Sequence, residues 1–405
     1  MLEHQEFWGF TYVSIDLVSC FFIAICLIFT SLLTPLKIDK PSNIIIYTIY
    51  ILVIIPTLTL TLGLREDSLK EYGIGLFCLV IGYIFLSFVT FLNVNKNPSS
   101  YSFPSINVKY FFLFFWFFCF FGLLFLFKDV INFVGLDNIY EQRAAGKSRN
   151  LFEGYMQSYF PNVICAALMA YGLYEKKFSY IFISGIGYVL MFGINAQRTV
   201  FLMPLILSLL YFYLKNNNYN KATLIKFNLC LSLILLILAL IPNGFLRDFL
   251  GFYLATRVIA TPGIMFSLYH DVFSQTSYTY WAHVKGVNLI VDKPYIFSND
   301  SDWPQLGYIV AKYKLGIISN SNANIFAADG VAAAGGIGII LISIIFAFYL
   351  YFLDFFSKNI DPRFKVLVAF PIGLALTNGS LATVLLTFGG IFWLLFYFFV
   401  SNRNS

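Results

Sequence analysis

Residues 110–127 read Tyr110-Phe-Phe-Leu-Phe-Phe-Trp-Phe-Phe-Cys-Phe-Phe-Gly-Leu-Leu-Phe-Leu-Phe127, with no charged residue and no proline. A run of this length and composition can cross the hydrocarbon core of a bilayer as a helix. Lipid offers the backbone no hydrogen-bond partners, so a spanning segment must be helical or part of a closed barrel. The apolar residues here are continuous rather than alternating, which favours the helix.

The rest of the chain has the same character. Of its 405 residues, 59% are hydrophobic and 11% are charged, whereas soluble domains have roughly 45–50% and 25%. We therefore predict an all-α polytopic membrane protein with a single integral membrane domain, residues 1–405. We expect a bundle of about eleven helices, or up to twelve if part of the longest loop enters the membrane. The predicted spans are residues 11–33, 43–64, 73–92, 110–128, 155–174, 178–195, 199–214, 224–243, 334–356, 364–377 and 380–400.

Cysteine usage and charge exclude several classes of protein. All six cysteines fall inside predicted spans, so the sequence indicates neither a disulfide framework nor a metal site. The net charge of +6 is better explained by loops that face a negative cytoplasmic leaflet than by a nucleic-acid partner. We expect no metal, no other cofactor and no nucleic acid.

Lysine and arginine predict the orientation. The odd-numbered connections and the C-terminal tail carry 13 of these cations, and the short even-numbered connections carry 7. Connections rich in Lys and Arg remain on the cytoplasmic side. This bias predicts that the N-terminus and both long polar loops lie outside.

The first long loop covers residues 129–154. Asp137 is the predicted N-cap of a short interfacial helix, and the i,i+4 spacing of Arg143 and Lys147 would place both cations on one face of it. Such a face could hold an anionic lipid or a sugar acid. The alternative interpretation is an ordinary solvated face.

The second long loop covers residues 244–333. Its first part, through Arg257, is a helix-like run that we expect to lie at the outer surface and to end near Thr261-Pro262-Gly263. Tyr253 and Arg257 share a face of this helix, which would set a cation beside an aromatic ring suited to stacking on a sugar. The alternative is headgroup anchoring. Near the end of the loop, the small-residue run 332–338 predicts close helix packing.

No phosphate-binding loop, dinucleotide fingerprint, zinc spacing or serine-hydrolase elbow stands out. With the long loops outside the cell, a bond-forming reaction there needs a donor that carries its own activation, such as a sugar on a lipid diphosphate. Arginines can stabilise the charge of the leaving diphosphate. The foremost candidate is Arg198, in a very short predicted outer turn. The alternative for Arg198 is a side chain that merely marks a helix end.

An acceptor hydroxyl also needs a base. His283 combines a suitable pKa range with aromatic neighbours, and Asp329 lies where the long loop returns to the membrane. Each could instead be a surface or capping residue. The other outer candidates are His270, Asp271, Asp300 and Asp302.

The chain resembles the bacterial O-antigen polymerases, also called oligosaccharide repeat-unit polymerases. The residues that carry the resemblance are Asn195-Ala-Gln-Arg198 before a span, Arg257 followed by Thr261-Pro-Gly263, and Asn322-Ala-Asn324 before a span with Gly335, Gly336 and Gly338. Arg143 and Gly154 also fit an arginine, ten-residue, glycine spacing of that family, which neither Arg247 nor Arg257 repeats.

The resemblance implies a glycosyltransferase of the bacterial inner membrane with its active site facing the periplasm. It would transfer a growing glycan from undecaprenyl diphosphate to the non-reducing end of a lipid-linked repeat unit. The implied partners are undecaprenyl-diphosphate-linked oligosaccharides, membrane lipids and a chain-length regulator protein. Arg198 and Arg257 would neutralise the diphosphate, His283 or Asp329 would act on the acceptor, and Asn322 and Asn324 would orient sugars. The alternatives are an O-antigen ligase and a lipid-linked-oligosaccharide flippase or other transporter.

Overall fold

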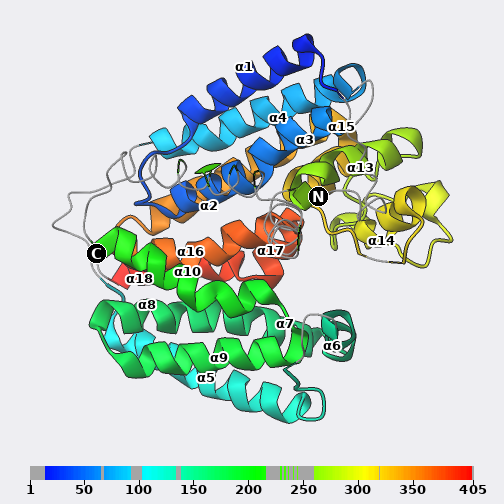
Figure 1. The fold of residues 1–405 in the computed structure, drawn as a ribbon. Coiled ribbons are helices and arrows are strands. Elements are labelled where there is room, and N and C mark those ends of the chain that lie inside the picture. The colour runs from blue at the N-terminus through cyan, green and yellow to red at the C-terminus, as the bar shows by residue number, and fades with distance from the viewer. Residues whose placement is uncertain are drawn as a thin grey trace.

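The computed structural model describes residues 14–64, 68–92, 103–133, 138–215, 260–318 and 320–403, with a few isolated positions between 229 and 244. Within these ranges the chain is helical and has no β-strand (Figure 1). The α-helices are α1 (Leu17–Leu33), α2 (Pro41–Ile49), α3 (Ile55–Gly63), α4 (Ser68–Phe91), α5 (Ile106–Leu126), α6 (Ile139–Ala145), α7 (Leu151–Tyr159), α8 (Ala166–Glu175), α9 (Phe178–Asn195), α10 (Arg198–Lys215), α13 (Thr261–Gln275), α14 (Leu306–Val310), α15 (Ala332–Phe356), α16 (Pro362–Leu376), α17 (Leu381–Thr387) and α18 (Gly390–Arg403).

Among the described residues, four π-helical stretches join or extend α-helices. Tyr50–Ile54 links α2 to α3, Phe160–Cys165 links α7 to α8, Phe326–Val331 leads directly into α15, and Ala311–Leu315 extends α14. A π turn widens the backbone and often lies at a functional site. The second and third of these stretches contribute residues to the candidate site described below.

Six helical stretches among the described residues are long and apolar enough to cross a membrane: 41–63, 69–91, 107–126, 178–195, 198–215 and 326–356. Helices α17 and α18 would make a seventh span if they count as one segment bent by 54°. The membrane class is therefore confirmed by the helices. The predicted span at 224–243 lies almost entirely outside the described residues.

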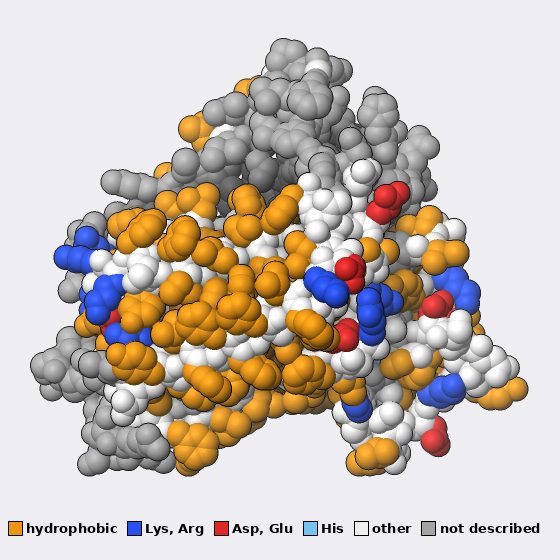
Figure 2. Space-filling view, turned by 90° about the horizontal axis from the view of Figure 1, so that it is seen from below, with side chains coloured by type: hydrophobic (Ala, Val, Ile, Leu, Met, Phe, Trp, Pro, Cys, Tyr) orange, Lys and Arg blue, Asp and Glu red, His pale blue; other side chains and the backbone are white. Residues whose placement is uncertain are grey.

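The outer surface of the bundle supports the same class. Figure 2 shows one face on which hydrophobic side chains form a broad band, with charged side chains gathered at the two sides of the band. Among the exposed residues of this kind on α5 are Phe114 and Phe125, which are 67% and 74% exposed. Large exposed apolar side chains are costly in water but suit a helix face that contacts lipid.

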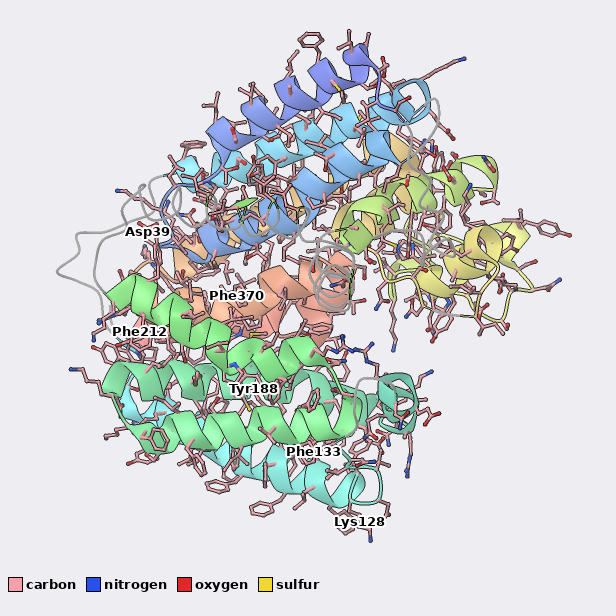
Figure 3. All side chains as sticks on the ribbon, viewed as in Figure 1. Asp39, Lys128, Phe133, Tyr188, Phe212 and Phe370 are labelled. Carbon is pink, nitrogen blue, oxygen red and sulfur yellow. The ribbon has the colours of Figure 1, made fainter. Side chains whose placement is uncertain are left out.

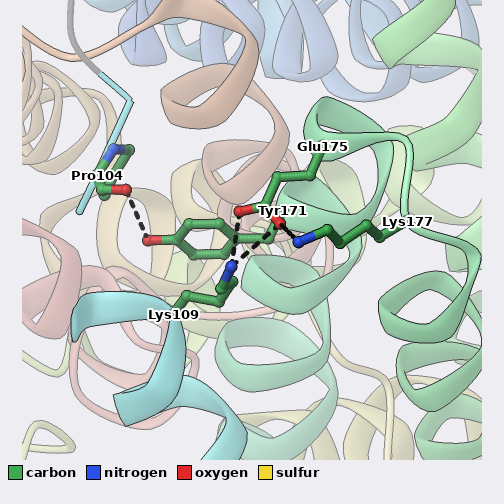
Figure 4. A network of polar contacts seen from close by, with 5 residues as sticks. All are labelled: Pro104, Lys109, Tyr171, Glu175 and Lys177. Carbon is green, nitrogen blue, oxygen red and sulfur yellow. Dashed lines mark hydrogen bonds and ion pairs between the residues drawn. The ribbon is translucent and has the colours of Figure 1, made fainter. Parts of the chain in front are cut away.

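Ion pairs and hydrogen bonds fasten the helices at one end of the bundle. Lys109 of α5 lies 2.9 Å from a carboxylate oxygen of Glu175 at the end of α8, and Lys177 approaches the same carboxylate at 3.2 Å (Figure 4). Tyr171 donates to the carbonyl of Pro104 at 3.4 Å. In Figure 3, Asp39 and Phe212 mark this end of the bundle, whereas Lys128 and Phe133 lie toward the other.

Small residues allow the predicted close packing of the ninth span. A Cβ on Gly336 would lie 2.8 Å from the sulfur of Cys78 on α4, and one on Gly82 would lie 2.4 Å from the hydroxyl of Ser343. Helices α4 and α15 therefore pack with their backbones close together, as small residues permit. The packing prediction for the run 332–338 is confirmed, although α15 has non-helical backbone angles at Ala334 and Gly335.

The long loop contains a helix where the sequence predicted a helix end. Thr261-Pro262-Gly263 begins α13, since proline suits the first turn of a helix, where its missing N–H is no loss. A Cβ on Gly263 would lie 2.8 Å from the backbone of Pro56, so this glycine allows α13 to pack against α3. The helix-like run that we expected to end near this tripeptide lies outside the described residues.

Candidate functional site

A polar cavity of about 620 Å³ opens where the ends of several helices meet. It is lined from α10, the π-helical segment Phe160–Cys165, the turn after α16, and the loop on either side of α14. Six lining side chains carry amides: Asn162, Gln197, Gln305, Asn320, Asn322 and Asn378. Amides both donate and accept hydrogen bonds. The cavity thus presents many neutral polar groups of the kind that pair with hydroxyls.

The tight turn between α9 and α10 places part of this lining. Ala196 adopts the left-handed conformation, with a φ of 49°. The side chain of Asn195 then accepts a hydrogen bond from the backbone N–H of Gln197 at 3.1 Å. The turn sets Gln197 and Thr199 on the cavity wall on either side of Arg198, which begins α10 and is partly buried. The predicted short connection at Arg198 is therefore confirmed and lies beside the cavity.

His283 lines the cavity and lies next to Asp329. Nδ1 of His283 is 2.9 Å from the hydroxyl of Thr279, and Nε2 is 3.5 Å from a carboxylate oxygen of Asp329. Both side chains are buried, at 6% and 1% exposure. The other carboxylate oxygen accepts a hydrogen bond from the backbone N–H of Leu381 at the start of α17. Asp329 therefore ties His283 to the helix that borders the cavity.

The backbone just before His283 is strained. Tyr280 and Trp281 have φ values of 46° and 61°, which L-residues with side chains rarely adopt. Each such residue costs of the order of 1–3 kcal/mol and persists only where its surroundings enforce it. Hydrogen bonds from the N–H groups of Thr279 and Tyr280 to the carbonyls of Ala332 and Ala333, at 2.9 Å each, hold the loop against the irregular start of α15. Tertiary contacts thus fix the position of His283.

The two asparagines singled out from the sequence differ in position. Asn322 lines the cavity. Asn324 is 1% exposed, donates to the carbonyl of Pro262 at 2.9 Å and accepts from the N–H of Ala327 at 3.0 Å. Asn324 therefore fastens the start of α13 to the π-helical segment Phe326–Val331. Among the described residues only Asn322 of this pair meets the cavity.

The first loop contacts the turn that carries Arg198 through Gln142, a residue that sequence reasoning missed. Gln142 is 5% exposed, and its amide nitrogen lies 2.8, 2.7 and 3.1 Å from the carbonyl oxygens of Val130, Gly193 and Ile194. A glutamine in a polar loop gives no sequence signal of burial. Gln142 therefore holds α6 against the end of α9, and one of its acceptors, Ile194, lies three residues before Gln197.

The segment held by this clamp carries three cations and α10 begins with a fourth, and we call these four residues the basic rim: Arg143, Lys147, Arg149 and Arg198. The first three are exposed. Helix α6 ends at Ala145 with Gly146 as its C-cap, so Lys147 follows the helix and the predicted shared face of Arg143 and Lys147 was wrong. The N-cap is Asn138, and Asp137 lies outside the described residues, as do Tyr253, Arg247 and Arg257.

The remaining acidic and histidine candidates lie elsewhere in the long loop. Asp271 accepts from the hydroxyl of Tyr72 at 2.5 Å and pairs with Lys314 at 2.7 Å, and Asp300 pairs with Lys312 at 3.3 Å. Asp302 lies 4.0 Å from the same lysine. These carboxylates are engaged in ion pairs and are not part of the cavity wall.

Among the described residues, one group of side chains could hold a metal ion. Glu71, His270 and Asp271 offer ligand atoms within 4.8 Å of one another. Burial lowers the pKa of His270, against the opposing effect of Asp271. A metal would have to compete with Lys314 and Tyr72 for the Asp271 carboxylate, so the group fits its present hydrogen bonds better than an ion.

The fold and the cavity define an all-helical membrane protein with a polar site at one end of the bundle. No protein-family model, curated protein or solved structure matches the chain.

Proposed function

We propose that this protein is a membrane glycosyltransferase that polymerises lipid-linked oligosaccharide repeat units. The observation that carries the proposal is the amide-lined cavity, whose wall includes Gln197 and Thr199 on either side of Arg198. Sugar hydroxyls need closely spaced donors and acceptors, whereas a diphosphate needs fixed positive charge. Neutral amides and cations at one end of a membrane bundle suit a substrate that combines a glycan with an anionic lipid.

In this proposal the basic rim receives the diphosphate of the donor. Arg198 neutralises the charge that develops as the polyprenyl diphosphate leaves the sugar, and Arg143 and Lys147 hold the diphosphate at its outer side. Arginine is suited to this work because its planar fork can bind two phosphate oxygens at once. Arg257 and Tyr253, which lie outside the described residues, keep their proposed roles in diphosphate binding and sugar stacking.

The acceptor reacts near His283. The hydroxyl oxygen of the acceptor forms the new bond to the donor sugar, and the proton of that hydroxyl passes to His283. The bond between the donor sugar and the diphosphate breaks, and the polyprenyl diphosphate departs with its electrons. Nε2 of His283 lies 3.5 Å from a carboxylate oxygen of Asp329, which would stabilise the imidazolium. A positioned base contributes roughly 10²- to 10⁴-fold. Direct action of Asp329 is the alternative, and its burial at 1% exposure favours His283.

The proposed topology places this end of the bundle outside the cell. Eleven spans with the N-terminus outside would set both long loops in the periplasm of a bacterial inner membrane, with the lysine-rich connections in the cytoplasm. A donor that carries its own leaving group needs no nucleotide on that side. A chain-length regulator protein could act there without any change to the chemistry.

The test replaces Arg198 by alanine in the native host. We expect the protein to insert normally and the surface glycan to be reduced to single repeats, because neutralisation of the leaving group is lost. Lys177→Ala, at the opposite end of the bundle, is the matched control and should leave chain length unchanged. Normal chain length with Arg198→Ala refutes the proposal. A deletion strain with no repeat attached would indicate the ligase, and repeats retained inside the cell would indicate the flippase.

A further inference from the structure

A second cavity, of about 340 Å³, lies between α5, α7, the π-helical segment Phe160–Cys165 and α18. We call it the aromatic groove. Its wall is apolar and mostly aromatic, with Phe111, Phe115 and Phe118 from α5, Phe152 and Tyr155 from α7, and Phe392 from α18. The α5 part of the wall, Phe111 to Cys119, covers eight residue steps, or about 12 Å along the helix axis. The groove is therefore elongated along a membrane-spanning helix.

The groove begins beside the basic rim. Phe152 lies in the first turn of α7, three residues after Arg149 of the rim. Asn150 caps this helix by accepting from the N–H of Glu153 at 2.9 Å, and a Glu153 oxygen accepts from the N–H of Arg149 at 2.7 Å. These bonds fix the backbone of the rim to the helix that forms the groove. An anionic head group at the rim would have its chain next to the groove.

The groove also shares a wall with the polar cavity. Neighbouring residues of one π-helical segment face the two spaces, Asn162 the polar cavity and Val163 the groove. Similarly, Phe388 at the end of α17 lines the polar cavity, and Phe392 of α18, four residues later, lines the groove. Gly389 permits this close contact, since a Cβ there would lie 2.2 Å from Val163. The two spaces therefore share the segment Phe160–Cys165 as part of their walls.

We infer that the aromatic groove binds the polyprenyl chain of a lipid-linked saccharide, with the diphosphate at the basic rim and the sugars in the polar cavity. This inference rests on the proposed function. Lipid tails are as apolar as the groove, so the hydrophobic effect does not drive the chain into it. Selection comes instead from the fit of the chain against fixed rings and from the attraction between the diphosphate and the rim.

The test uses the full chain in phosphatidylcholine nanodiscs and undecaprenyl diphosphate that carries a photoactivatable diazirine on its chain. Peptide mass spectrometry locates the adducts. We expect adducts on α5 and α7 to exceed those on the exposed face of α1 at least fivefold. Excess unlabelled undecaprenyl diphosphate should remove them, and excess phosphatidylglycerol should not. Equal labelling of α1, or removal by phosphatidylglycerol, would show an ordinary lipid contact and overturn the inference.

A pair of variants on one helix controls for changes in folding. Phe115→Trp enlarges a groove side chain, whereas Phe114→Trp makes the same change on the lipid-facing side of α5, outside the groove. Labelling should fall severalfold in the first variant alone, and an equal effect in both would contradict the inference. If the groove of the native protein is labelled but Arg198→Ala makes glycan of normal chain length, only the proposed function is overturned. If the groove is not labelled but Arg198→Ala makes short glycan chains, only the inference that the groove binds the polyprenyl chain is overturned.

Discussion

Replacing Gln142 by alanine should release α6 from the end of α9. The amide nitrogen of Gln142 has two hydrogens and lies within 3.1 Å of three backbone carbonyl oxygens, and its contacts with those of Gly193 and Ile194 are buried. A hydrogen bond contributes about 0.5–1.5 kcal/mol, and a buried acceptor left without a donor costs about 1–3 kcal/mol. We therefore expect the free energy that favours the docked loop over the undocked loop to fall by about 2 kcal/mol. That loss raises the undocked population about 30-fold, because each 1.4 kcal/mol is a factor of ten.

Hydrogen exchange measures this opening directly. In Gln142→Ala, the amides of residues 138–150 should exchange up to about 30-fold faster, while those of α15 keep their rate. Glu141→Ala, an exposed neighbour on the same helix, is the control and should leave exchange unchanged. If the proposed function is correct, Gln142→Ala should also shorten the glycan, because three cations of the rim are carried by the released segment. Unchanged exchange at 138–150 would show that the clamp does not hold the loop.

Two further predictions concern packing in the bundle. Gly338→Ala should lower the thermal stability in detergent by several degrees, because its Cβ would lie 2.2 Å from the carbonyl oxygen of Gly330. The control, Gly185→Ala in α9, has open space around it and should be neutral or slightly stabilising. Equal changes in thermal stability for the two variants would refute the argument. Asp354→Ala should destabilise the bundle by about 3 kcal/mol, because Ser42 donates to this buried carboxylate from its N–H at 3.0 Å and from its hydroxyl at 2.6 Å. Ser42→Ala removes only the hydroxyl and should cause a clearly smaller loss of stability. A loss of equal size in the two variants would contradict this account.

Six of the predicted spans coincide with long apolar helices of the structure, because the signal for such helices is local, but the predicted count of eleven is not confirmed. The apolar run around Trp116 and the uncharged run before Asn195 are helical, and the helix at residues 178–195 has the predicted bounds. A spanning backbone must satisfy its own hydrogen bonds, so hydropathy and length are sufficient to locate it. Local reasoning is ambiguous at Thr261-Pro262, because one proline can indicate either the end of a helix or its start, and the structure begins α13 there.

The site was only partly predictable, because its members are far apart in the sequence. Local composition drew attention to His283, Asp329 and Asn322, and the structure places His283 and Asn322 on the wall of one cavity and Asp329 against His283. Nothing local distinguishes Asn322, on the cavity wall, from the buried Asn324 two residues later. Gln142 gave no signal at all, because its burial depends on carbonyl groups of α9 that lie some fifty residues along the chain.

By itself, therefore, the sequence determined that this chain is a helical membrane protein, because the need to satisfy the backbone in lipid acts on each segment separately. Only the tertiary structure decided which polar side chains meet in one cavity and which fasten the helices. That choice depends on contacts between segments distant in sequence, such as Asp329 with His283 and with the start of α17. The energies of those contacts arise only when the helices pack.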